Sequence, residues 1–213
     1  MTLFPVSVRE LEYEKARIFT RLKLNADENV RTYAEEIFPR LVQLLHENME
    51  LLLAYNIVDN DLTVSSPELI NCELLAVCYC GATQKIVDCI DALMDAGDFL
   101  EGYILNDLAN EVLFNASNAM NRRMYGELKA QGYHLGTRMT PGENHLNMEY
   151  QAQFLSLLTQ GEPFPVTLTE HYMLQPEKAM LYGYGVGTAL PDRSVDHDCS
   201  KCPNISCYMR RDI

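Results

Sequence analysis

Residues 74–81 read Leu-Leu-Ala-Val-Cys-Tyr-Cys-Gly, and this stretch decides the fold class. An unbroken apolar run that stops at a glycine predicts a strand buried on both faces. The residues just after it have the i, i+1, i+4, i+7, i+8 spacing of an amphipathic helix: Ile86, Val87, Ile90, Leu93 and Met94. The chain therefore places a buried strand directly before a helix.

A second, longer helix follows after the break at residues 95–98. Its apolar face is continuous: Leu105, Leu108, Ala109, Val112, Leu113, Ala116, Ala119 and Met120. The helix also carries an unusual set of asparagines, Asn110, Asn115, Asn118 and Asn121. Asparagine is rare in helix interiors because its side chain competes for backbone hydrogen bonds.

The rest of the chain mixes strands and helices. Patterns typical of helices cover residues 8–24, 30–45 and 150–158, with a kink or a break expected at Pro39. Extended patterns cover residues 51–58, 133–139, 166–173 and 179–186, the last two separated by a turn at Pro176. Because there is no regular βαβ alternation, we predict an α+β fold.

The charge balance excludes several classes of partner. There are 30 acidic residues against 17 Lys and Arg, giving a formal net charge of −13. Nucleic acids and anionic lipid surfaces both need concentrated positive charge. No apolar run approaches the roughly 20 residues that span a bilayer, and residues 1–6 do not resemble a signal peptide. We therefore expect a cytoplasmic protein that binds neither nucleic acid nor membranes.

Three cysteines crowd the C-terminal end in the pattern Cys199-x2-Cys202-x4-Cys207. Two residues between thiols let one loop wrap a zinc ion or an iron–sulfur cluster. The fourth ligand is open: His197, a cysteine distant in sequence, or no protein group at all. Iron–sulfur is our leading interpretation and structural zinc the alternative, whereas Cys78, Cys80 and Cys89 fit apolar core positions. The sequence gives Cys72 no assigned role.

A single arginine stands out before a turn. Arg138 precedes Thr140-Pro141-Gly142, which fixes a guanidinium at the edge of a loop. The planar fork of arginine suits carboxylates. The alternative is an ordinary surface arginine beside a turn.

Three stretches together resemble a known family. Residues 138–142, Arg-Met-Thr-Pro-Gly, are similar to the Arg-x-x-Pro-Gly motif in the activation domain of cobalamin-dependent methionine synthase. Residues 168–173, Leu-Thr-Glu-His-Tyr-Met, resemble that domain's Leu-Thr-Glu-Ser strand, and residues 108–123 resemble its long central helix. With its Cys-rich end, the chain is most like the short stand-alone activation-domain proteins of anaerobes.

The resemblance implies a fold and a ligand. The fold would be a twisted antiparallel sheet packed with long helices. Arg138 would contact the methionine carboxylate of S-adenosylmethionine, and the backbone of Met139, Pro141 and Gly142 would line the adenosyl pocket. Residues 1–190 would form the activation-domain-like unit, with N-terminal helices within residues 8–55, and residues 191–213 a metal- or cluster-binding tail.

The resulting functional hypothesis is an accessory protein that reactivates or services a corrinoid-dependent methyltransferase. The tail, with Cys199, Cys202, Cys207 and His197, would hold an iron–sulfur cluster that passes an electron to the cobalamin of a corrinoid partner. Whether the chain is itself an enzyme, acting by S-adenosylmethionine-linked remethylation, stays open. The alternative is a non-enzymatic binding or scaffold module with structural zinc in its tail.

Overall fold

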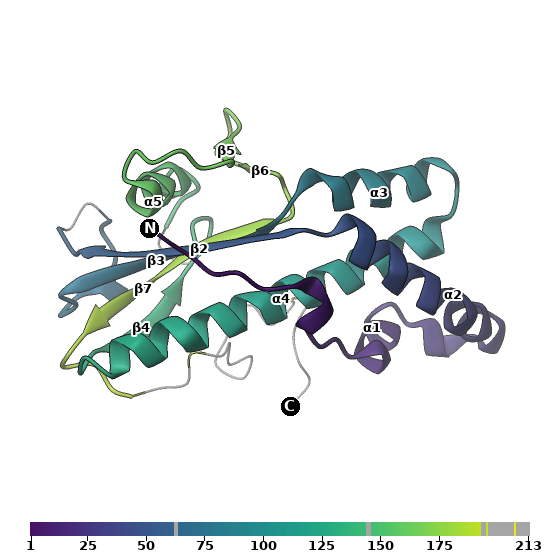
Figure 1. The fold of residues 1–213 in the computed structure, drawn as a ribbon, viewed down its shortest axis with the longest axis horizontal. Helices are drawn as coiled ribbons and strands as arrows, with labels where there is room; N and C mark the ends of the chain where they lie inside the picture. The colour runs from purple at the N-terminus through teal and green to yellow at the C-terminus, as the bar shows by residue number, and fades with distance from the viewer. Residues whose placement is uncertain (62–63, 144–145, 193–194, 196–206, 208–213) are drawn as a thin grey trace.

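The computed structural model of this chain describes residues 1–61, 64–143, 146–192, 195 and 207. Its centre is an antiparallel five-stranded sheet with the strand order β1-β2-β3-β7-β4 (Figure 1). The strands are β1 (Thr2–Leu3), β2 (Leu51–Asp59), β3 (Leu74–Ala82), β7 (Ala179–Gly187) and β4 (His134–Met139). The predicted antiparallel α+β fold is confirmed.

The buried strand predicted at residues 74–81 is β3, the middle strand of the sheet. Successive side chains of a strand point to opposite faces. Ala76, Cys78 and Cys80 join the core beneath one face, while Leu75, Val77 and Tyr79 join the core beneath the other. Cys78 and Cys80 are fully buried, as their apolar surroundings predicted.

One long helix covers the first of these faces. It is α4 (Phe99–Lys129), and it continues the predicted stripe by about two turns at each end. The opposite face is covered by α5 (Tyr150–Thr159) and a small ladder of β5 (Thr167–Leu168) and β6 (Leu174–Gln175). Figure 1 shows α4 and α5 on opposite sides of the sheet.

The remaining helices gather around the N-terminal half of α4, beyond one end of the sheet (Figure 1). They are α1 (Lys15–Arg21), α2 (Glu28–Asn48) and α3 (Gln84–Asp95), with short 3-10 turns η1 (Val8–Glu10), η2 (Leu24–Ala26) and η3 (Pro67–Leu69). Asp27 caps α2 by accepting from the backbone N–H groups of Asn29 and Val30. No helix in the described part of the chain is both long and apolar enough to cross a membrane.

Several sequence predictions were wrong in detail. The single helix expected at 8–24 is divided into η1, α1 and η2, because Leu11 and Tyr13 pack against the core from a non-helical segment. The N-terminal helices end at Asn48 and not near residue 55, and residues 51–59 form β2, in agreement with the extended pattern at 51–58. Pro39 does not break α2, and its exposed position leaves the displaced carbonyl open to water.

The strand expected at 166–173 is also mostly absent. Only Thr167 and Leu168 pair there, because the Thr169 hydroxyl oxygen accepts hydrogen bonds from the backbone N–H groups of His171 and Met173. Tyr172 has a positive φ of 62°, which closes the turn. A side chain that bonds the local backbone competes with strand pairing.

Candidate functional site

Arg138 lies on the edge strand β4, on the sheet face that α4 covers. It pairs with Tyr184 of β7, just after a register shift between Leu135 and Arg138. Its guanidinium carbon lies 3.8 Å from the centre of the Tyr182 ring, and its Nη2 lies 3.8 Å from the Met180 sulfur. The guanidinium therefore extends along β7 rather than out into solvent.

The hydrogen-bonding capacity of Arg138 is only partly used within the described residues, where its one hydrogen bond is the weak contact of Nη2 with the Met180 sulfur. Its Nε is buried and has no hydrogen-bond acceptor, and the guanidinium forms no ion pair there. A buried donor without an acceptor costs about 1–3 kcal/mol. An arginine held in this state is ready to receive a planar anion such as a carboxylate.

The facing side of α4 contributes a bridge of hydrogen bonds. The Tyr182 hydroxyl donates to Asn121 Oδ1 at 3.0 Å, and Asn121 Nδ2 donates to the Tyr184 hydroxyl at 3.2 Å. This bridge fixes the two rings, including the one on which Arg138 lies. Asn118, one turn earlier on the same side of α4, is only 6% exposed and makes no hydrogen bond with the described residues.

A second cation lies near the start of β7. Lys178 Nζ donates to Asn106 Oδ1 at 2.7 Å and to Asn110 Oδ1 at 2.9 Å. Burial lowers the pKa of Lys178, since the charged form loses hydration. Asn106 and Asn110 thus contact Lys178, and Asn121 contacts the two tyrosines, whereas Asn115 donates to the Glu12 carbonyl. We call the following set the polar strip: Arg138, Lys178, Asn106, Asn110, Asn118, Asn121, Tyr182 and Tyr184.

The predicted binding motif is split by strand alternation. The side chain of Arg138 faces α4, whereas Met139 is buried in the core on the α5 side. Pro141 is buried, and Gly142 adopts a positive φ of 88° in an exposed turn where its N–H donates to the Leu146 carbonyl at 2.8 Å. Only Arg138 of the four predicted residues presents its side chain to the strip, so Met139, Pro141 and Gly142 would contribute through their backbone.

The glycines of β7 explain why the sheet is so closely covered on the α5 side. A Cβ at Gly183 would lie 3.1 Å from the Phe154 ring, and one at Gly185 would lie 2.4 Å from the Cys72 sulfur. The alternating tyrosines therefore point to α4 and the glycines to tightly packed neighbours. This arrangement accounts for the Gly-Tyr-Gly-Val-Gly stretch without a phosphate loop.

Burial keeps the thiols near Arg138 protonated, and a protonated thiol is a poor nucleophile. Burial raises the pKa of Cys78 to about 12, although the nearby Arg138 charge acts in the opposite direction. The Cys78 sulfur lies 3.7 Å from the Met124 sulfur inside the core. Cys72 is buried and Cys89 partly buried against the core, so these mid-chain cysteines pack as small apolar groups.

Most of the predicted metal ligands lie outside the described residues. This applies to His197, Cys199 and Cys202, whereas Cys207 is described and partly exposed. Within the described ranges, no group of three or more His, Cys, Asp and Glu side chains is placed to hold a metal. The metal assignment of the tail stays a prediction.

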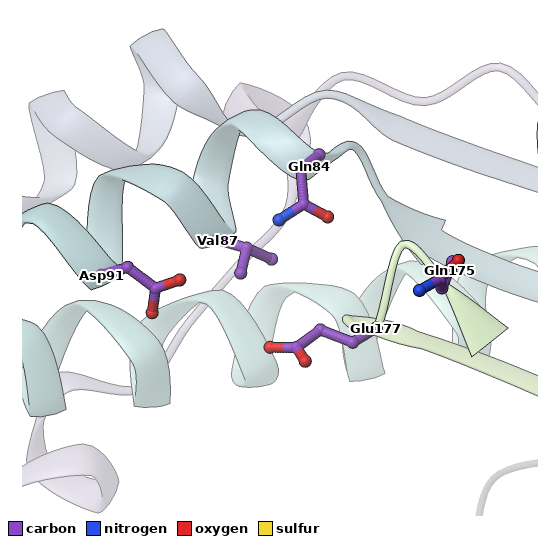
Figure 2. Close-up of a pocket in the computed structure, with 5 residues that line it drawn as sticks. All are labelled: Gln84, Val87, Asp91, Gln175 and Glu177. Carbon is purple, nitrogen blue, oxygen red and sulfur yellow. The ribbon is translucent and has the colours of Figure 1, made fainter. Parts of the chain in front are cut away.

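A separate surface hollow lies between α3 and the segment that enters β7. It has a volume of about 440 Å³ and is lined by Gln84, Val87, Asp91, Gln175 and Glu177. Figure 2 shows the carboxylates of Asp91 and Glu177 directed into this space from the two sides. No pattern in the sequence indicated this hollow, and its exposed, acidic lining is unlike the polar strip.

Sequence reasoning identified Arg138 and noted the asparagines but missed Lys178, Asn106, Tyr182 and Tyr184. The available signal was the asparagine run itself, because so many carboxamides in one helix imply polar partners on the facing element. Lys178 gave no signal, since a lysine before a strand is ordinary.

Comparison with solved structures finds proteins of similar fold. No protein-family model matches this chain, and neither does any curated protein. A solved structure of the MetH reactivation domain bound to AdoHcy matches with a TM-score of 0.57 and 14% identity, covering 88% of this chain and 74% of that one. The fold expected from the three sequence motifs is therefore confirmed: this chain has the fold of the MetH reactivation domain.

Proposed function

We propose that this chain is an accessory protein that reactivates or services a corrinoid-dependent methyltransferase, and that its polar strip binds an adenosyl amino acid. The observation that carries the proposal is Arg138, whose buried Nε has no acceptor among the described residues. It lies at the sheet edge of a fold shared with a domain whose structure contains AdoHcy. S-adenosylmethionine and AdoHcy both carry the carboxylate that such a guanidinium fits.

The residues of the strip would each contact a different part of such a ligand. Arg138 would take the carboxylate through its fork, and Asn118 would use its free carboxamide for the amino group or the ribose. The turn at Pro141 and Gly142 would line the adenosyl group with backbone atoms. Asn121 would act as a positioning residue, because it fixes the Tyr182 ring under Arg138.

The proposed chemistry is a reductive methylation of the partner's cobalt. One electron converts Co(II) to Co(I), and the cobalt electron pair then attacks the sulfonium methyl group. A Co–C bond forms, the S–C bond breaks, and its electron pair stays on sulfur, which leaves AdoHcy. This chain would bind the methyl donor and dock the corrinoid protein, and the electron would come from a reductant.

The reaction itself gives the test. A corrinoid protein without its own activation domain, poised as Co(II), is mixed with titanium(III) citrate and S-adenosylmethionine carrying a labelled methyl group. We expect labelled methyl to reach cobalt at up to one per corrinoid, and only when this chain is present. Equal transfer without the chain would overturn the proposed role.

Matched variants separate ligand binding from folding in that assay. Arg138→Gln removes the proposed carboxylate contact, whereas Arg31→Gln removes one positive charge from an exposed position on α2. We expect methyl transfer to fail with Arg138→Gln and to persist with Arg31→Gln. Equal activity of the two variants would contradict the assignment of Arg138.

For the tail, we propose that Cys199, Cys202 and Cys207 hold an iron–sulfur cluster, with His197 as a candidate fourth ligand. Such a cluster would supply electron transfer to the corrinoid partner. Iron and sulfide analysis of protein purified without oxygen tests this, and we expect a brown sample containing both. A colourless sample with stoichiometric zinc would instead support a structural tail on a binding or scaffold module.

A further inference from the structure

Lys178 places a second positive charge on the polar strip. An ammonium group has three N–H donors. Two of them are directed at Asn106 Oδ1 and Asn110 Oδ1, at 2.7 and 2.9 Å. Both acceptors are neutral carboxamides, so the charge of Lys178 is solvated by the protein without being cancelled by these contacts.

The two cations of the strip are neighbours along β7. Lys178, Met180 and Tyr182 alternate onto one face, with a spacing of roughly 7 Å between every second residue of a strand. Arg138 lies over Tyr182 and reaches the Met180 sulfur. Met180 therefore sits between the Lys178 ammonium and the Arg138 guanidinium.

The nearest carboxylates do not neutralise this pair fully. Asp107 Oδ2 already accepts from Arg21 Nε and Nη2, at 3.0 and 2.8 Å. Glu177 raises the pKa of Lys178 by its charge, but its carboxylate is directed into the hollow beside α3 (Figure 2). In a chain with a formal net charge of −13, the strip is a local site of positive charge.

From this charge distribution we infer that Lys178 makes the strip bind the neutral thioether AdoHcy more tightly than the sulfonium S-adenosylmethionine. The inference rests on the proposed function, because it concerns the ligand of the same strip. At pH 7 the two ligands differ by one methyl group and one positive charge. The product of the proposed methyl transfer would then compete with the donor, so that the ratio of the two compounds would control reactivation.

The expected size of the preference follows from Coulomb's law. Two unit charges about 10 Å apart, at an effective dielectric constant of about 20, give roughly a tenfold difference in affinity. Arg138 contributes to the same field, but its attraction for the carboxylate is common to both ligands. Both cations disfavour the added positive charge of the sulfonium, so Lys178 contributes to the difference between the ligands on top of the contribution of Arg138.

Calorimetric titration of each compound into the full chain tests the inference. We expect wild-type protein to bind AdoHcy at least about tenfold more tightly than S-adenosylmethionine, and Lys178→Gln to lower this ratio by about threefold or more. Arg31→Gln, the charge-matched control on α2, should keep the wild-type ratio. The readout is the ratio of the two dissociation constants. Altered packing that weakened the binding of both compounds equally would leave this ratio unchanged.

A second measurement uses only wild-type protein, so it does not depend on whether the variant folds. Salt screens charge interactions, so the preference should shrink between 0.05 and 0.5 M sodium chloride, a range over which the Debye length falls from roughly 14 to 4 Å. A wild-type affinity that is equal for both compounds, or higher for the sulfonium, would overturn the inference and leave the ligand site standing. Binding of neither compound would overturn both proposals.

Discussion

The buried charged groups along the two halves of α4 differ in whether they are paired with an opposite charge. Toward the N-terminus, each buried carboxylate has an arginine partner: Glu101 with Arg40, Asp107 with Arg21, and Glu111 with both Arg17 and Arg21. Along the polar strip, Arg138 has no carboxylate partner among the described residues, and its Nε has no acceptor.

This difference separates a structural charge network from a region that we propose to be a binding surface. In the first region every partner comes from another helix, so the ion pairs hold α1 and α2 against α4. In the second region, the Tyr182 ring holds the Arg138 guanidinium in place, and the carboxamides of Asn106 and Asn110 hold the Lys178 ammonium. These contacts leave N–H donors available to a ligand. Removing charge should therefore destabilise the first region and disable binding in the second.

The largest effect is expected from Arg21→Met. The Arg21 side chain is 8% exposed and forms ion pairs with Asp107 and Glu111, so its loss leaves buried Asp107 without its arginine and Glu111 with Arg17 alone. We expect the free energy of unfolding to fall by about 3–5 kcal/mol, measured by urea denaturation. The exposed pair Arg123–Glu127 gives the control, and Arg123→Gln should cost under about 1 kcal/mol. Similar losses in both variants would remove the distinction between buried and exposed ion pairs.

A smaller effect is expected within the strip itself, from Asn121→Ala. This change removes the acceptor of the Tyr182 hydroxyl and a donor to the Tyr184 hydroxyl, both inside the core. We expect a loss of about 1–3 kcal/mol in unfolding free energy. Asn118→Ala breaks no hydrogen bond with the described residues, and alanine favours helix formation, so it should cost about 1 kcal/mol or less. A larger loss for Asn118→Ala than for Asn121→Ala would contradict the proposed roles.

The smallest effect concerns Asp192, near the far end of α4. Hydrogen bonds from Lys129 and Tyr125 lower the pKa of Asp192. A carboxyl whose folded-state pKa is depressed adds stability above its unfolded pKa, near 4, and loses it as the pH falls through the folded value. In Asp192→Asn, the stability should therefore depend less steeply on pH below about pH 4. At neutral pH the stability should change only modestly. Thermal unfolding between pH 2 and 7 measures this, and an unchanged acid limb would show that Asp192 does not contribute.

Elements with strong periodicity could be predicted from sequence. The buried run at 74–81 and the apolar stripe at 105–120 gave β3 and α4, because burial on both faces or along one face dictates those patterns. The breaks at 11–14 and 169–172 could not be predicted in this way. The first depends on where Leu11 and Tyr13 pack, and the second on a threonine side chain that bonds its own turn.

The candidate site could be predicted from sequence only in part, for a related reason. Arg138 belongs to a local motif, so its place before a turn could be inferred. Lys178 and Asn106 meet across 72 positions of sequence, and only the packing of β7 against α4 brings them together. The asparagines of α4 were recognisable as unusual in a helix, but the sequence did not indicate the partner of any of them.

Calorimetric titration of AdoHcy into wild-type protein and Arg138→Gln tests the central claim most directly, that Arg138 is held ready for a ligand carboxylate. We predict saturable one-to-one binding to wild-type protein and an affinity about 10- to 100-fold lower for Arg138→Gln, as expected for loss of a charged hydrogen bond. The unfolding free energy of the variant should stay within about 1 kcal/mol of wild type. Unchanged affinity in a folded Arg138→Gln protein would contradict the account.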